Sequence, residues 1–210
     1  MRLSRYCFIV AHVMEIFSSY FYWIDFAIGS ATPMVVYALY RSGKIDGFVW
    51  RLFWIGCALG LTWELPLSLI NEYSECCPVA TFIQPLPTHF SVIVITHSFW
   101  DGGLFLAGVA LVYLICGKDS FEEFRVRELA VLVVYGQVSE IIVELLSTFN
   151  DAWAYVPYWW NPSMFKFNGH DITPLPQVIW LVAPIVFYFI ALRAKSRMSV
   201  FEEDVKKVGD

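Results

Sequence analysis

An apolar run between residues 90 and 116 is long enough to cross a lipid bilayer as a helix. A histidine and an aspartate, His97 and Asp101, interrupt it four residues apart, so both side chains lie on one face of that helix. Ionisable groups are costly at bilayer depth, and these two are therefore expected to face protein or a cavity rather than lipid. Gly102 and Gly103 follow directly and leave room beside them for another helix or a ligand.

Further apolar runs indicate that the whole chain is a membrane protein. Of its 210 residues, 58% are hydrophobic and the mean hydropathy is +0.59, whereas soluble domains are about 45–50% apolar. We predict an all-α, polytopic membrane bundle of about five transmembrane helices around a polar, acidic cavity. The expected spans are residues 21–40, 48–70, 90–116, 129–149 and 175–192.

The two ends of the chain are expected to differ from this bundle, which covers residues 21–193. Residues 1–20 carry Arg2 and Arg5 before an apolar stretch, as a signal peptide does, but no convincing cleavage site follows. We interpret this segment as an amphipathic or partly inserted helix, and whether it crosses the membrane stays open. Residues 194–210 are expected to form a charged tail.

Basic residues indicate the orientation of the bundle. Lys and Arg gather in the loops after the first and third spans and in the tail, while the other two loops carry only Lys166. The positive-inside rule therefore places the basic loops and the tail in the cytosol. Five spans then put the N-terminus on the opposite side.

Two of the loops have a distinctive composition. Residues 117–128 are polar and charged and are predicted to form a surface loop. Residues 150–174 are rich in Trp and Tyr, which favours an interfacial aromatic belt over a lid above a pocket.

Polar side chains also mark one face of the spans on either side of residues 90–116. These faces consist of Gly60, Glu64, Ser68 and Asn71 in the second span, Gln137, Glu140 and Glu144 in the fourth, and Gln177, Trp180 and Pro184 in the fifth. No Lys or Arg lies within these spans away from their edges, so the carboxylates have no evident cationic partner. Ionised together they would lose hydration and repel one another, so the cluster is expected to hold at least one proton near neutral pH.

Simpler interpretations stay open for several of these residues. Glu144 could snorkel to the membrane surface or cap a neighbouring helix. His97 could be a neutral packing histidine bonded to a carbonyl group. Gln137 and Gln177 could be interhelical hydrogen-bonding residues, which are common in membranes.

Short motifs in the fourth and fifth spans resemble the last two helices of the EXPERA domain, which emopamil-binding sterol isomerases share with the sigma-2 receptor. The pair Gly136-Gln137, followed by Glu140, is similar to the Gly-Gln pair that precedes an acid in that family, although the acid comes one residue earlier here. Gln177, Trp180 and Pro184 are similar to an Asn-x-x-Trp-x-x-x-Pro pattern, with Gln in place of Asn. The resemblance covers roughly residues 51–193.

Other positions in this region bear on the same resemblance. Glu64 resembles the acid of the family's first core helix. The acid of the second core helix is not matched in place, and His97 and Asp101 occupy that helix instead.

A second resemblance is to the small integral-membrane terpene cyclases of fungal meroterpenoid pathways. Trp63-Glu64 and Asp101-Gly102 are similar to fragments of these proteins, in which an acid from each of two helices protonates an epoxide or alkene. Their second acid comes late in the chain, whereas Asp101 lies in the middle. Both resemblances imply protonation of an apolar isoprenoid or sterol and stabilisation of a carbocation.

We therefore expect a membrane-embedded isomerase or terpene-cyclase-like enzyme that acts on a sterol or isoprenoid lipid. Glu64 and Asp101 would donate and accept the proton, and His97 would tune Asp101. A π face would stabilise the cation. The residues expected to bind the substrate are Trp63, Trp100, Gln137, Glu140, Glu144, Gln177 and Trp180.

The competing hypothesis is a non-catalytic sterol- or lipid-binding membrane protein in lipid trafficking or regulation. A channel or transporter is less favoured because the sequence shows no inverted repeat. The expected partners are the apolar substrate and the lipid bilayer, with a homodimer left open; nucleic acid, metal ions and organic cofactors are not expected. The expected location is the endoplasmic reticulum membrane in a eukaryote or the inner membrane in a bacterium.

Overall fold

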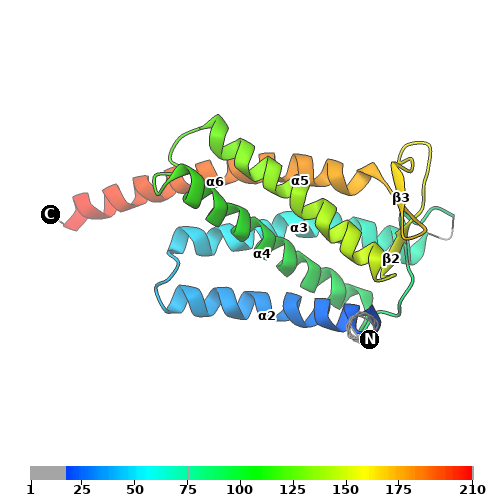
Figure 1. Ribbon diagram of the computed structural model, residues 1–210. Helices are drawn as coiled ribbons and strands as arrows, with labels where there is room; N and C mark the ends of the chain where they lie inside the picture. Colours follow the sequence, from blue (N-terminus) through cyan, green and yellow to red (C-terminus); the bar gives the residue numbers. More distant parts are fainter. Residues whose placement is uncertain (1–17, 75, 210) are drawn as a thin grey trace, which may run out of the picture.

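Five helices lie side by side in the part of the chain that the computed structural model describes, residues 18–74 and 76–209 (Figure 1). They are α2 (Phe21–Arg41), α3 (Gly47–Tyr73), α4 (Phe90–Cys116), α5 (Val126–Phe149) and α6 (Pro174–Gly209). Helix α4 packs against α2, α3 and α5, and α6 packs against α3 and α5. The prediction for residues 1–20 lies outside the described residues except for its last three.

Four of the described helices are long and apolar enough to cross a membrane: α3, α4, α5 and residues Pro174–Met198 of α6. The third predicted span, residues 90–116, coincides with α4. Helix α2 coincides with the first predicted span, residues 21–40, but it is not among the four helices that are long and apolar enough to cross a membrane. Helix α6 does not end with the fifth predicted span and continues through the charged segment to Gly209.

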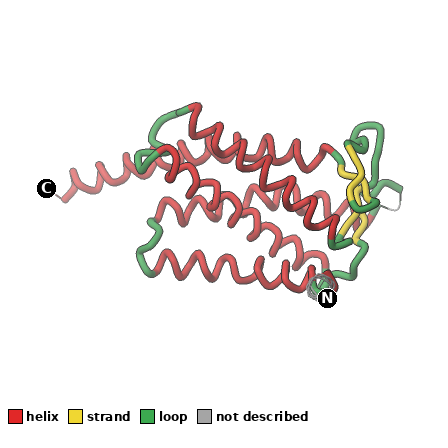
Figure 2. The backbone as a smooth tube through the Cα atoms, viewed as in Figure 1, coloured by secondary structure: helices red, strands yellow, loops and turns green. Residues whose placement is uncertain are grey.

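Short strands close one end of the bundle, opposite the end where α6 projects (Figure 2). Strand β1 (Ala80–Phe82) pairs antiparallel with β2 (Trp153–Tyr155), and β3 (Phe165–Phe167) pairs antiparallel with β4 (His170–Ile172). The side chain of Asn71, near the end of α3, accepts hydrogen bonds from the backbone amides of Val79 and Ala80 at 2.8 and 3.0 Å. The strands are too short to show a period in the sequence, and their pairing joins loops far apart in the chain.

The helices share a core in which aromatic rings are stacked. Phe105 of α4 stacks on Phe187 and Trp180 of α6, with ring centroids 4.4 and 5.4 Å apart. Trp63 of α3 meets Trp180 edge to face at 6.1 Å. This aromatic group joins three helices, and two of its members, Trp63 and Trp180, line the cavity described below.

Glycines allow α3 and α4 to approach closely. A Cβ atom on Gly56 would lie 3.0 Å from the Cα of Gly102, and one on Gly102 would clash with Cys57. A Cβ atom on Gly60 would clash with the carboxyl group of Asp101. The space predicted beside Gly102 is therefore filled by a neighbouring helix, as in other tightly packed membrane helices.

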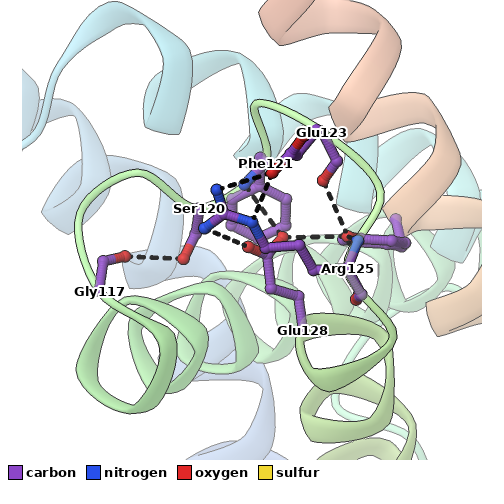
Figure 3. A network of polar contacts seen from close by, with 7 residues as sticks. Gly117, Ser120, Phe121, Glu123, Arg125 and Glu128 are labelled. Atoms are coloured by element: carbon purple, nitrogen blue, oxygen red, sulfur yellow. Dashed lines mark hydrogen bonds and ion pairs between the residues drawn. The ribbon is translucent and has the colours of Figure 1, made fainter.

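Residues 117–128, predicted to be a polar surface loop, are mostly exposed, but Ser120, Phe121 and Glu128 are buried (Figure 3). Helix α5 begins at Val126, so Glu128 belongs to the helix, and its side chain is fully buried together with Phe121. The Glu128 carboxylate accepts hydrogen bonds from the Phe121 amide and from the Tyr188 hydroxyl of α6, both at 3.0 Å. The prediction is therefore confirmed for most of the segment and wrong for Glu128, because a carboxylate with such partners can be buried.

Candidate functional site

A cavity of about 430 Å³ lies between the helices at the strand-covered end of the bundle. Residues of α2, α3, α4, α5 and α6 line it, and residues in and beside β1 and β2 complete its wall. Its volume lies in the range of sites that hold small organic ligands, about 300–1,000 Å³. Its polar lining consists of Asp25, Glu64, Ser68, Asn71, His97, Asp101, Glu140, Glu144, Ser147 and Tyr155, and no Lys or Arg is among the described residues that line it.

The predicted polar faces of three spans meet in this cavity. Glu64, Asp101 and Glu140 come from α3, α4 and α5, and all three line it. Ser68 and Asn71 extend the polar face of α3 along the same wall. The helical spacing of the sequence therefore placed these side chains correctly relative to one another.

His97 bridges two carboxylates on different helices. Its Nε2 atom lies 2.9 Å from Oδ2 of Asp25 on α2, and its Nδ1 atom lies 3.3 Å from Oε2 of Glu64 on α3. Neither ring nitrogen contacts Asp101 one turn away, because both contact other acids, and the expectation that His97 tunes Asp101 stays a prediction. The alternative of a packing histidine bonded to a carbonyl group is also wrong.

Two hydrogens are needed to satisfy both contacts of the His97 ring. The imidazolium can donate from both nitrogens to two carboxylates, or a protonated Asp25 or Glu64 can donate to a neutral ring that donates to the other acid. Both arrangements give the three side chains a net charge of −1. They differ only in the position of one proton along a hydrogen bond, which is the property required of a proton relay.

Asp101 lies in the cavity without such a partner. The residue is 7% exposed, and its Oδ2 atom is buried with no hydrogen-bond partner among the described residues. The close approach of Gly60 confines the carboxyl group on the side of α3. An unpaired carboxylate in such a place would be costly, so Asp101 is well suited to carry a proton and to give it to a bound molecule.

A second group of acids lies nearer the strands. Glu140 and Glu144 are both buried and one helical turn apart on α5. The Tyr155 hydroxyl of β2 donates a hydrogen bond of 2.7 Å to Oε1 of Glu144, whose Oε2 atom has no partner. Burial and then the charge of Glu144 raise the pKa of Tyr155 well above its usual value, so the phenol stays protonated as the donor.

Aromatic side chains form most of the remaining wall. Trp63, Trp100 and Trp180 all line the cavity, as predicted for substrate contact. The Trp180 ring is stacked on Phe105. The indole Nε1 of Trp100 donates a hydrogen bond of 3.0 Å to the backbone carbonyl of Asp25. A cation inside the cavity would therefore be surrounded by indole rings as well as by acids.

The two predicted glutamines lie outside this lining. Gln137 donates from Nε2 to the backbone carbonyl of Gln177 at 2.9 Å, which ties α5 to α6 and agrees with the interpretation as an interhelical bonding residue. The Nε2 atom of Gln177 is buried without a partner. Glu144, by contrast, faces the cavity, so the interpretation of a snorkelling or capping residue is wrong.

Sequence reasoning missed three residues of the site. Asp25 is an acid in an apolar segment, but its position in the sequence does not predict a contact with His97. Trp153 and Tyr155 lie in the aromatic loop, and both line the cavity because β2 pairs with β1 over its end. The lid interpretation thus holds for this part of the loop, whereas Trp159 is 93% exposed, as expected of a belt residue.

Among the described residues, no group of three or more His, Cys, Asp and Glu side chains is arranged to hold a metal ion. No protein-family model, curated protein or solved structure matches the chain. The site itself therefore has to carry the functional argument.

Proposed function

We propose that the protein is a membrane-embedded isomerase or cyclase that acts on a sterol or other isoprenoid lipid by adding and removing a proton. The observation that carries this proposal is the Asp101 carboxyl group, buried and unpartnered in an apolar cavity walled by indole rings. An acid with no fixed hydrogen-bond partner keeps its proton available to a bound molecule, and an alkene carbon, which offers no lone pair, needs an acid placed directly against it.

Asp101 and Glu64 divide the chemistry in this proposal. The Asp101 O–H bond breaks as its proton adds to one carbon of an alkene, the π electron pair forms the new C–H bond, and the neighbouring carbon becomes a cation. Glu64 then removes a proton from an adjacent carbon, and the released C–H pair forms the shifted double bond. In a cyclase, a second alkene attacks the cation before that proton is lost.

The cavity wall supports the charged intermediate. Trp180 and Trp63 present π faces, and a cation over an indole ring is stabilised by about 0.5–2 kcal/mol. The described lining has several carboxyl groups and no basic side chain, so the field of the site also favours positive charge. Exclusion of water protects the cation from capture as an alcohol.

The membrane arrangement belongs to the same proposal. Helix α2 contains 21 residues, or about 32 Å of helix, which is enough to span the hydrocarbon layer. Its Trp23, Met34 and Val35 side chains are exposed and suit a lipid-facing surface. With α2 as a fifth span, the tail is cytosolic and the strands lie on the other side, in an endoplasmic reticulum or bacterial inner membrane. An EXPERA-like core over residues 51–193 fits this arrangement.

The test is conversion of candidate lipids by the purified protein in phospholipid nanodiscs, followed by extraction and mass spectrometry. Asp101→Asn and Glu64→Gln are expected to lower turnover by on the order of 10²–10⁴-fold, the usual contribution of a positioned acid or base. The control is Glu72→Gln, an exposed acid at the end of α3, which should keep full activity. Unchanged turnover in both cavity variants would contradict the catalytic assignment.

A non-catalytic lipid-binding protein is the second candidate, and the size and apolar wall of the same cavity favour it equally. The two proposals separate on turnover. A protein that binds a sterol or isoprenoid stoichiometrically, yet converts none of the panel, would be a binding protein.

A further inference from the structure

Two neighbouring cysteines, Cys76 and Cys77, lie in the loop between α3 and β1, at the strand-covered end of the bundle (Figure 1). Both are exposed, free thiols. The Cys77 thiol donates a hydrogen bond to Sγ of Cys76, and the two sulfur atoms are 2.8 Å apart. A disulfide bond of about 2.0 Å is therefore within reach of a small movement, and the loop presents a pair of thiols rather than two independent ones.

Ser74, the residue that follows α3, contacts both members of the pair. Its Oγ atom accepts a hydrogen bond of 3.2 Å from the Cys77 amide and lies 3.8 Å from Sγ of Cys76. The hydrogen bond from the Cys77 thiol, and then the contact with Ser74, lower the pKa of Cys76 below that of an ordinary thiol. The thiolate is the form that attacks a disulfide, so Cys76 is expected to react first.

The segment after the pair is anchored to the cover of the cavity. The Tyr158 hydroxyl donates a hydrogen bond of 2.8 Å to the Pro78 carbonyl, and the Val156 amide donates one of 3.0 Å to the Val79 carbonyl. Val79 is buried and lines the cavity. The pair is thus held between the end of α3 on one side and the strands on the other, which keeps its two sulfur atoms close together.

We propose that Cys76 and Cys77 form a redox-active dithiol site, which exchanges with disulfide compounds and closes to a disulfide between neighbouring residues. The Cys76 thiolate attacks one sulfur of glutathione disulfide, a mixed disulfide forms, and the other glutathione leaves as a thiolate. The Cys77 thiolate then attacks the Cys76 sulfur, and the second glutathione leaves. The pair loses two electrons, and its two thiol protons pass to the two glutathione molecules that are released.

The geometry suits reversible exchange better than a structural role. A ring closed between neighbouring residues is strained, and strained, exposed disulfides are readily reduced again. Such a bond closes almost no loop of the chain, so it adds little stability. Structural metal sites use about four ligands, whereas no group of three or more suitable side chains is found among the described residues.

The membrane arrangement proposed above places the pair where disulfides form. Residues 71–89 carry no Lys or Arg, and with five spans they lie opposite the cytosol. The lumen of the endoplasmic reticulum and the bacterial periplasm are both oxidising, so disulfides persist there. This part of the inference rests on the proposed membrane arrangement, but not on the proposed reaction.

The test incubates the purified protein in phosphatidylcholine nanodiscs with glutathione disulfide, traps the remaining thiols with N-ethylmaleimide and maps the peptides by mass spectrometry. The wild-type peptide that carries both cysteines should lose two reactive thiols and the mass of two hydrogen atoms, with no glutathione attached. Cys76→Ser and Cys77→Ser should each keep one glutathione on the remaining cysteine, because no second thiol displaces it. Dithiothreitol should restore both thiols of the wild type.

The matched controls are Cys116→Ser and Cys7→Ser, which retain both members of the pair. Cys116 ends α4 at the opposite end of the bundle (Figure 1). Both controls should form the same disulfide as the wild type. Glutathione that stays on the wild-type pair, a pair that remains fully reactive, or a bond from either cysteine to another cysteine would overturn the proposal.

A second measurement separates the dithiol from the proposed membrane arrangement. Sealed vesicles of known orientation are treated with a membrane-impermeant maleimide, and labelling of the reduced pair is compared between wild type and the double variant Cys76→Ser/Cys77→Ser. Labelling from the non-cytosolic face supports the inference in full. Labelling from the cytosolic face only, together with disulfide formation in nanodiscs, would support the dithiol and reject the proposed membrane arrangement.

Discussion

Two buried carboxyl groups in this bundle, Glu128 and Asp101, have opposite surroundings. Glu128, beside the loop between α4 and α5, accepts hydrogen bonds from the Phe121 amide and the Tyr188 hydroxyl, and its Oε1 atom lies 3.7 Å from the Arg125 guanidinium (Figure 3). Asp101 is nearly as buried and lines the cavity, but its Oδ2 atom has no hydrogen-bond partner among the described residues.

The difference distinguishes an acid that stabilises the fold, Glu128, from the acid that we propose to be catalytic, Asp101. A carboxylate that receives donors from a loop and a neighbouring helix stabilises the fold, and its removal leaves those donors unpaired. A carboxyl group without partners contributes little to stability, and its position in a cavity is the reason that we propose a chemical role for it. Burial alone does not distinguish them, because both side chains are hidden from water.

The largest expected effect is the difference in stability between two alanine variants, Glu128→Ala and Asp101→Ala. Glu128→Ala should lower the free energy of unfolding by about 2–5 kcal/mol, because it removes the acceptor of two buried donors, the Phe121 amide and the Tyr188 hydroxyl. Asp101→Ala should change it by less than about 1.5 kcal/mol, the net worth of one hydrogen bond. Chemical denaturation in detergent micelles measures both, and equal losses would remove the distinction.

The acids that line the cavity could largely be predicted from the sequence. Glu64 and Asp101 stand out because an acid inside an apolar run is costly unless it faces protein or a cavity, and helical spacing then places it on a face. The third span was predicted to the residue because an apolar run ends where its hydrophobic side chains end. These features depend on positions close together in the chain.

The remaining features depend on contacts between distant segments. The sequence around Glu128 predicts a charged loop, because its burial depends on a hydrogen bond from Tyr188 in the last helix. The sequence around Tyr155 predicts an interfacial aromatic residue, because its place in the cavity wall depends on the pairing of β1 with β2. Asp25 belongs to the site through its contact with His97, which is 72 residues away in the chain. No local pattern encodes these pairings.

An intermediate effect is expected where α3 meets Asp101. Gly60→Ala would put a methyl group against the Asp101 carboxyl, and overpacking of this kind costs about 1–3 kcal/mol. It should also displace the acid and lower turnover along with stability. The control is Gly47→Ala, at the start of the same helix, where a Cβ atom meets nothing within 4 Å.

Gly47→Ala is expected to keep activity and to leave stability unchanged or raise it by up to about 1 kcal/mol. Unfolding and lipid conversion measured on both alanine variants give the comparison. If Gly60→Ala behaves like Gly47→Ala, the carboxyl group has room to move, and Asp101 is not held in place by α3.

The smallest effect concerns the hydrogen bond at the strand end of the cavity, between Tyr155 and Glu144. Tyr155→Phe should cost about 0.5–1.5 kcal/mol at neutral pH, the net value of one hydrogen bond, whereas Tyr73→Phe, at a residue 70% exposed, should cost nothing measurable. Burial, followed by the charge of Glu144, raises the pKa of Tyr155 in the folded protein. Stability from this group is therefore fully present below the unfolded pKa of about 10 and is lost as the pH rises above it.

The phenyl ring that replaces the phenol in Tyr155→Phe has no proton to lose, so the stability gap between wild type and this variant should narrow as the pH rises above about 10. Denaturation curves of both proteins at a series of pH values from neutral to alkaline measure that gap. A gap that stays constant would mean that the Tyr155 phenol titrates alike in the folded and unfolded chains. The strand end would then be open to water, and the loop around β2 would act only as an aromatic belt and not as the cover of the cavity.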